Sequence, residues 1–181
     1  MIARITGVVV ELFEKGMVIE TAGIGYAVYS PAIFSIGERV TLHTHLVIRE
    51  DAHELYGFVY PDEKTLFTSL ISVSGVGPKT GLHMLTMYPL SELVRAIRSG
   101  DAKAISLVPG IGKKTAEKVI IDLKDKLAGF GVSEQLGASD LVEALLSLGF
   151  KDGDIRNAIS SIDASQTLER QITLALQILK K

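Results

Sequence analysis

Two glycine-containing turns, each with lysine close behind, give this chain its clearest chemistry, which is the binding of phosphate. Glycine allows a positive φ and close approach by another molecule. A helix that begins directly after such a turn presents unpaired N–H groups and the positive end of its dipole to an anion. We therefore predict two clamps that hold a nucleic-acid backbone without reading its bases. Their residues are Gly75, Val76, Gly77, Lys79, Gly110, Ile111, Gly112, Lys113, Lys114 and Lys118.

The two turns belong to an internal repeat. Residues 70–85 read LISVSGVGPKTGLHML and residues 105–120 read ISLVPGIGKKTAEKVI, so equivalent positions lie 35 apart. A single Gly-x-Gly between helices can be an ordinary helical hairpin turn. Two copies, both accompanied by lysine, favour the clamp. A P-loop does not fit, because Leu107 stands where that motif needs a glycine ahead of Gly112.

A pair of adjacent carboxylates, Glu50 and Asp51, lies between two segments of β character. The residues alone leave three interpretations open. The pair can be a solvated hairpin turn, or it can repel a phosphate backbone and push strands apart. With Glu54 it can also form a metal site, which ranks last because no aspartate–histidine cluster accompanies it. His43 and His45 share a strand face, but two histidines are too few, and we predict no metal site.

The elements that must position these residues fall into an α+β multidomain chain. Residues 1–62 contain five short β segments separated by turn signals, which predicts a small barrel of the OB type. Residues 63–128 are all-helical and carry the tandem helix–hairpin–helix repeat. Residues 129–138 are glycine-containing and predict a flexible linker. Residues 139–181 predict three short helices and a marginal core, which is typical of a tethered docking module.

Helix starts are predicted from residues that cap helices well. Asp62, Ser91, Asp101 and Ser139 each precede a helical apolar pattern and are the expected N-caps. The helix after the second turn is expected to run over residues 113–127.

The charge distribution places the basic surplus beside the glycine turns. The whole chain has a net charge of −2, but residues 61–131 contain ten Lys or Arg against seven Asp or Glu. This is the electrostatic footprint expected of a nucleic-acid binder, and it predicts salt-sensitive binding. The absence of cysteine excludes disulfides and thiolate metal sites. The first residues contain charges and no long apolar run, so we expect a soluble cytoplasmic protein without membrane contact.

Several motifs in the same order resemble the RuvA family, the bacterial Holliday-junction branch-migration subunits. They are the opening MIARITG, REDAHELYGF at 49–58, TLFTSLISVSGVGPK at 65–79, LVPGIGKKTAEKVI at 107–120 and LGF at 148–150. The resemblance covers essentially the whole chain.

The resemblance implies a non-catalytic DNA-binding subunit for recombination, DNA repair and the SOS response to DNA damage. It implies a homotetramer, or two tetramers that sandwich a four-way junction. Glu50 and Asp51 match the family's acidic pin, which favours the repulsion interpretation. The third domain resembles the module, similar to ubiquitin-associated (UBA) domains, that docks the hexameric ATPase RuvB, with Leu148, Gly149 and Phe150 as docking residues. The RuvC resolvase is a further implied partner, and the chain needs no cofactor because the motor uses the ATP.

Three rival functions follow from parts of the sequence. PGIGKKTA also resembles the hairpin of helix–hairpin–helix DNA glycosylases, in which Lys114 would be the catalytic lysine. That family places an aspartate roughly twenty residues further on, where this chain has Val132 in the predicted linker. A nuclease would use Asp62 with Asp101 and Lys103, and an interaction protein would bind ubiquitin through residues 148–150.

Overall fold

The computed structural model describes residues 1–50, 52–127, 130, 137–150, 152–159, 162 and 168–179. Contacts divide the chain into two compact units, Met1–Phe130 and Gly131–Lys181, and each is described by itself. Most of the predicted linker, namely 129 and 131–136, lies outside the described residues.

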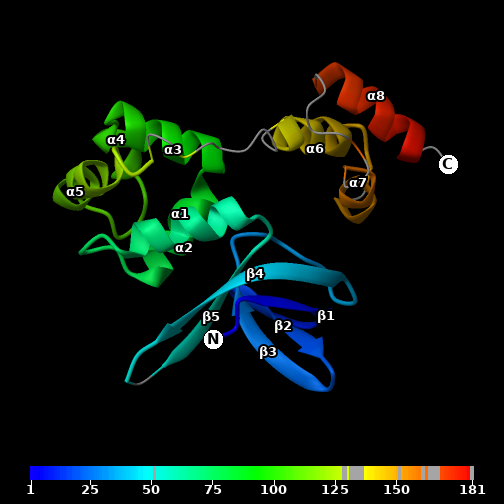
Figure 1. Cartoon of the computed structure of the whole chain (residues 1–181), viewed down its shortest axis with the longest axis horizontal. Helices are drawn as coiled ribbons and strands as arrows, with labels where there is room; N and C mark the ends of the chain where they lie inside the picture. The colour runs from blue at the N-terminus through cyan, green and yellow to red at the C-terminus, as the bar shows by residue number, and fades with distance from the viewer. Residues whose placement is uncertain are drawn as a thin grey trace. The chain divides into compact units, whose positions relative to one another are not determined.

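The first unit begins with a closed five-stranded barrel (Figure 1). Its strands are β1 (Arg4–Phe13), β2 (Gly16–Thr21), β3 (Ile24–Tyr29), β4 (Arg39–Ile48) and β5 (His53–Phe58). They follow one another round the barrel in the order β1-β2-β3-β5-β4, and only the β3–β5 pair is parallel. The core consists of Ile5, Val9, Met17, Ile19, Val28, Phe34, Val40, Leu42 and Leu55. The predicted OB-type barrel is confirmed.

In the described part of the first unit, five helices follow the barrel, in the region that was expected to be helical. They are α1 (Pro61–Ile71), α2 (Pro78–Met87), α3 (Leu90–Ser99), α4 (Ala102–Ile105) and α5 (Lys113–Leu123). The helix after the second turn therefore ends earlier than predicted, although Leu127 is still buried. Turns between α1 and α2 and between α4 and α5 carry the two glycine motifs.

Three N-caps were expected in this unit, and one of them, Asp101, is confirmed. Asp101 caps α4, and its Oδ1 accepts a hydrogen bond from the Ala104 N–H at 2.9 Å. Asp62 is not a cap, because Pro61 already occupies the first position of α1, where its missing N–H costs nothing. Ser91 likewise lies inside α3, whose N-cap is Pro89.

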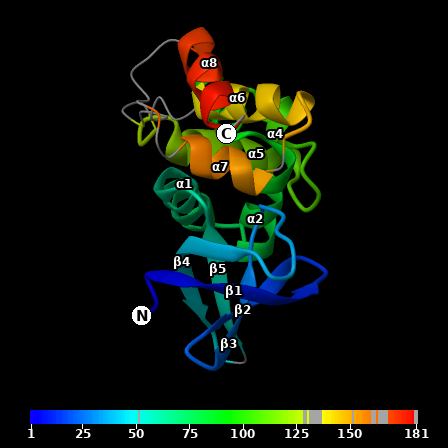
Figure 2. The ribbon, with the colours of Figure 1, turned by 90° about the vertical axis from the view of Figure 1, so that its right-hand side faces the viewer.

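An aromatic cluster joins the barrel to the helices. Tyr56 and Phe58 of β5 pack with Phe67 of α1 and Leu82 of α2. The ring centroids of Tyr56 and Phe58 each lie 4.9 Å from that of Phe67. Figure 2 shows α1 and α2 directly above the strands. Residues 56–58 are therefore core and not a platform for stacking bases, and the barrel and the helical repeat form one packed body.

Among its described residues, the second unit contains three helices: α6 (Gly137–Ser147), α7 (Asp152–Ile159) and α8 (Leu168–Leu179). Leu141, Leu145, Ile155 and Ala175 form its core. Ser139 was the predicted N-cap, but α6 already begins at Gly137, so that prediction is wrong. Within the parts of the chain that the structure describes, no helix has the length and apolarity needed to cross a membrane.

Candidate nucleic-acid interface

The sequence repeat is also a structural repeat. The first glycines, Gly75 and Gly110, have φ of 97° and 89°, a region in which a side chain is strained. The second glycines, Gly77 and Gly112, are the N-caps of α2 and α5, with φ, ψ of −85°, 167° and −84°, 168°. The glycines of the two turns therefore have closely similar backbone angles.

The apolar residue between each pair of glycines anchors its turn from the inside. Val76 and Ile111 are each 5% exposed. The N–H of Val76 donates to the carbonyl of Val73, and the N–H of Ile111 donates to that of Val108, both at 3.0 Å. Val76 and Ile111 therefore anchor the turn, because both their side chains and their N–H groups are engaged inside it.

The two turns pack against each other in a reciprocal way. A Cβ built on Gly75 would lie 3.5 Å from Cγ2 of Thr115, and one built on Gly110 would lie 3.6 Å from Oγ1 of Thr80. Thr80 and Thr115 are themselves equivalent positions of the repeat. Each turn thus faces the helix that follows the other turn, which is the pattern of a two-fold interface within one chain. This packing holds the two clamps side by side.

At the second glycine of each turn, neither the backbone conformation nor the packing requires glycine. A Cβ on Gly77 or Gly112 would meet nothing within 4 Å. Any residue can adopt their φ and ψ, and Ser, Asp or Asn would cap the helix better. Their lack of a side chain leaves open space directly over the first N–H groups of α2 and α5, where a phosphate would bind.

The two clamps differ in charge. Lys113, Lys114 and Lys118 are exposed on α5. The equivalent positions on α2 are Pro78, Lys79 and His83, so the first clamp has one lysine and lacks one N–H. The second clamp therefore offers more to a phosphate backbone.

This asymmetry predicts unequal salt dependence. Each lost phosphate contact removes about 0.9 from the slope of log K against log salt for duplex DNA. We expect Lys113→Ala/Lys114→Ala/Lys118→Ala to flatten the slope about three times as much as Lys79→Ala. Fluorescence anisotropy with labelled DNA over a salt series measures both slopes. Equal slopes for the two variants would contradict the assignment of the stronger clamp to α5.

The acidic pair lies on a two-stranded extension of the barrel. The pairs Val47↔Glu54 and Ile48↔His53 continue the β4–β5 ladder beyond the β1–β4 and β3–β5 pairing, and Figure 1 shows this ribbon reaching past the other strands. The Arg49 N–H donates to the Ala52 carbonyl at 2.8 Å and closes the tip. Glu50 is exposed there. Asp51 lies outside the described residues.

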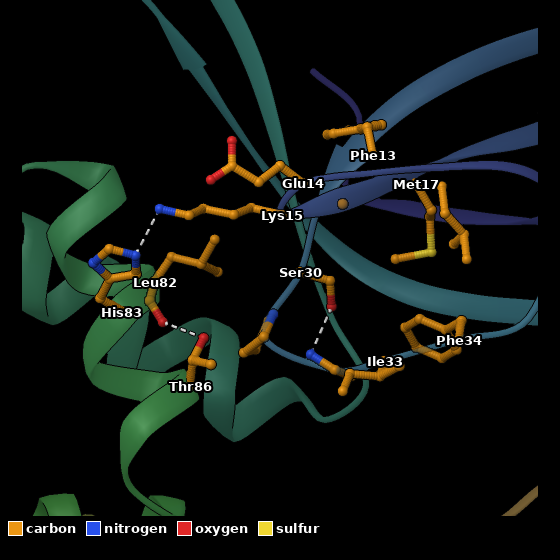
Figure 3. A pocket seen from close by; sticks show the side chains of 14 residues that line it. Phe13, Glu14, Lys15, Met17, Ser30, Ile33, Phe34, Leu82, His83 and Thr86 are labelled. Atoms are coloured by element: carbon orange, nitrogen blue, oxygen red, sulfur yellow. Dashed lines mark hydrogen bonds between the residues drawn. The ribbon is translucent and has the colours of Figure 1, made fainter.

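Polar contacts also connect the barrel with the first repeat. A cavity of about 390 Å³ lies between the β1–β2 turn, the β3–β4 connection and α2. At its edge Lys15 Nζ and His83 Nε2 lie 2.9 Å apart in a hydrogen bond (Figure 3). On the far side of α2, the Tyr88 hydroxyl donates to the Ala104 carbonyl at 2.8 Å and links the two repeats. The β1–β2 turn, the first clamp and the second clamp therefore belong to one connected framework.

His45 belongs to β4, and its ring packs against α1. The centroid of the His45 ring is 5.9 Å from that of Phe67. Burial, and then the nearby Lys64 ammonium, lower the pKa of His45 below its ordinary value of 6.5. Among the residues that the structure describes, no group of three His, Asp or Glu is placed to hold a metal.

The lowered pKa of His45 predicts how stability changes with pH. Because the unfolded chain binds this proton at a higher pH than the folded chain, folding loses stability as the pH falls below 6.5. We expect His45→Gln to remove this part of the pH dependence, whereas His43→Gln keeps it. Urea unfolding on both sides of the ordinary histidine pKa provides the comparison. An unchanged pH dependence in His45→Gln would rule out His45 as its source.

The rival sites gain no support from these positions. Asp101 is occupied as the cap of α4. Glu54 accepts a hydrogen bond from the Tyr56 hydroxyl and pairs with Arg49. Lys114 is exposed in the first turn of α5. Asp101, which a nuclease would use, and Glu54, which a metal site would use, are therefore engaged in structural contacts.

In the second unit, the residues predicted for motor docking divide between surface and core. Leu148 is 58% exposed, and Gly149 follows with φ of 87°. Phe150 is partly buried against the helical core. Sequence reasoning missed Leu146 and Ile178, which are also exposed. Their helical periodicity does not separate them from core leucines.

Three family models match the chain. The RuvA N-terminal domain matches residues 1–57, the SAM-like helix–hairpin–helix tandem matches residues 67–125, and the RuvA C-terminal domain matches residues 137–180. Together these matches cover most of the chain and coincide with the barrel, the repeat and the three-helix unit.

Curated relatives match over the same length. A protein of Dehalococcoides mccartyi is 41% identical, with 97% of each chain covered. Proteins of Chromobacterium violaceum and Aromatoleum aromaticum are 39% and 38% identical, with 100% of each chain covered. All three are named "Holliday junction branch migration complex subunit RuvA". With these family-model matches and full-length relatives, the chain belongs to the RuvA family.

Proposed function

We propose that this chain is the non-catalytic DNA-binding subunit of a branch-migration complex, which holds a four-way junction open and recruits the hexameric RuvB ATPase. The observation that carries the proposal is the pair of reciprocally packed clamp turns in one body with an acidic hairpin tip. The names of the curated relatives support it. Recombination and DNA repair in the cytoplasm are the proposed setting.

Clamps made of backbone N–H groups suit a junction that must move. Base-specific hydrogen bonds discriminate by about 1–3 kcal/mol for each contact, so they would stall migration at preferred positions. Contacts to phosphate carry no such preference. The carboxylates of Glu50 and Asp51 would repel the backbones at the crossover and keep separated strands apart.

The chain must form an oligomer if these contacts are to reach all four arms of the junction. In the proposal, a homotetramer, or two tetramers on opposite faces, presents the clamps to all four arms. The second unit docks the motor through the exposed Leu146 and Leu148, and the RuvC resolvase acts on the same junction. The chain uses no cofactor of its own, because ATP is hydrolysed by the motor.

Energy transfer between fluorophores on two arms of a four-way junction tests the proposal. In Mg²⁺ the free junction stacks its arms, and binding is expected to shift it to an open arrangement without producing cleaved DNA. Glu50→Gln/Asp51→Asn is expected to bind but to open the crossover less, because the repulsion is removed. Binding without any change in arm geometry, or cleavage of the junction, would contradict the proposal.

A further inference from the structure

The base of the acidic hairpin carries a positive charge, opposite in sign to the charges of the tip. Arg49 directly precedes Glu50 and Asp51. A guanidinium forms strong paired hydrogen bonds with carboxylates and with phosphates. An unoccupied Arg49 would therefore either neutralise the tip or bind the DNA backbone that the tip is proposed to repel.

Glu54, on the opposite strand, forms an ion pair with Arg49. Arg49 Nη2 lies 3.6 Å from Glu54 Oε2, and the two side chains are 45% and 13% exposed. The same carboxylate oxygen accepts a hydrogen bond from the Tyr56 hydroxyl at 3.1 Å. An exposed ion pair is weak because both side chains lose freedom, but here one partner is largely buried and already held in place.

Tyr56 positions Glu54 from a ring that is itself packed between two other aromatic rings. The ring is 1% exposed and lies between Tyr29 of β3 and Phe67 of α1, with centroid distances of 5.4 and 4.9 Å. Burial and the hydrogen bond to Glu54 raise the pKa of the Tyr56 phenol, so the hydroxyl keeps its proton and donates. A chain of contacts therefore runs from the helical repeat to the base of the hairpin.

We infer that Glu54, held by Tyr56, is a positioning residue that occupies Arg49, so that the hairpin tip meets DNA as a repelling group and not as a phosphate-binding one. With Glu54 included, residues 49–54 contain one basic and three acidic residues. The inference rests on the proposed function, because it assigns the acidic tip a place against the junction backbone.

The test uses the full chain with Glu54→Gln, Arg49→Gln and the double variant. Glutamine keeps the oxygen that accepts from Tyr56 but loses the charge that holds Arg49. Binding to a four-way junction and to linear duplex is measured over a salt series. A base analogue at the crossover, whose fluorescence rises on unstacking, reports opening.

Glu54→Gln is expected to tighten duplex binding, to steepen the salt slope by about 0.9 per engaged arginine, and to lower the crossover fluorescence. Adding Arg49→Gln is expected to restore wild-type values, whereas a loss of fold would not be restored. Arg49→Gln alone removes the cation and leaves Glu54 without its ion-pair partner, so it should not tighten duplex binding.

A Glu54→Gln variant with the wild-type salt slope and fluorescence would overturn the inference, as would a double variant that remains altered. If the wild type itself lacked any junction preference, the proposed function would fail, which is a distinguishable result.

Discussion

Replacing Gly77 and Gly112 together by aspartate is expected to abolish junction binding while the protein remains folded. Both residues are N-caps with extended backbone and open space around the missing Cβ. Aspartate is a better N-cap than glycine, by a few tenths of a kcal/mol. Its carboxylate, however, occupies the position of the phosphate. A hydrogen bond to a charged group contributes about 1.5–3 kcal/mol, so losing both clamps weakens binding at least about a hundredfold.

Thermal unfolding and a gel shift on the same samples measure the two effects. The matched control is Gly77→Asn/Gly112→Asn, which supplies an equal cap of nearly the same shape without the charge. The aspartate pair should bind much more weakly than the asparagine pair at equal stability. If both pairs bind alike, charge repulsion at the clamp is not the cause, and if the aspartate pair unfolds, the glycines serve the fold.

The first glycine of each turn should behave in the opposite way. Gly75 and Gly110 have positive φ, and a Cβ would meet only ordinary contacts at 3.5 Å or more. Alanine there is expected to cost about 1–2 kcal/mol of stability at each site. A melting curve that does not move for Gly75→Ala would contradict the strained geometry.

Removing residues 131–181 is expected to leave junction binding intact and to abolish stimulation of the motor. The first unit, Met1–Phe130, has its own core and contains both clamps and the hairpin. The second unit holds the exposed leucines proposed for docking. Junction gel shifts and the ATPase rate of a RuvB-type hexamer on junction DNA separate the two functions.

A full-length variant gives the finer comparison. Leu146→Ser/Leu148→Ser changes only exposed side chains and should reproduce the loss of motor stimulation, whereas substitution of Phe150 also disturbs the helical core. Normal stimulation by the shortened chain would place the docking surface in the first unit.

Local sequence predicted those features that depend on local chemistry. Glycine permits the positive φ found at Gly75 and Gly110, and Asp101 is the predicted cap of α4, because both features depend on a few neighbouring residues. The start of α1 was misassigned because the preference of proline for the first helical position outweighs an aspartate behind it. The prediction of Ser139 as an N-cap is wrong because α6 begins earlier, at Gly137.

Contacts between distant segments could not be predicted in this way. The bond between Lys15 and His83 spans 68 positions, and no periodicity indicates it. The pairing of Glu54 with Arg49 depends on how the two strands of the hairpin lie opposite each other, which the residues alone do not fix. The reciprocal packing of Thr80 and Thr115 had a signal, since the repeat aligns them, but the alignment alone does not bring the two turns together.

The most direct test of the central claim is a competition gel shift at moderate salt, in which labelled four-way junction competes with linear duplex of the same length and sequence. The chain is expected to prefer the junction strongly, and Gly77→Asp/Gly112→Asp is expected to lose that binding. Equal affinity for the two DNAs would contradict a scaffold that recognises junction shape through paired backbone clamps.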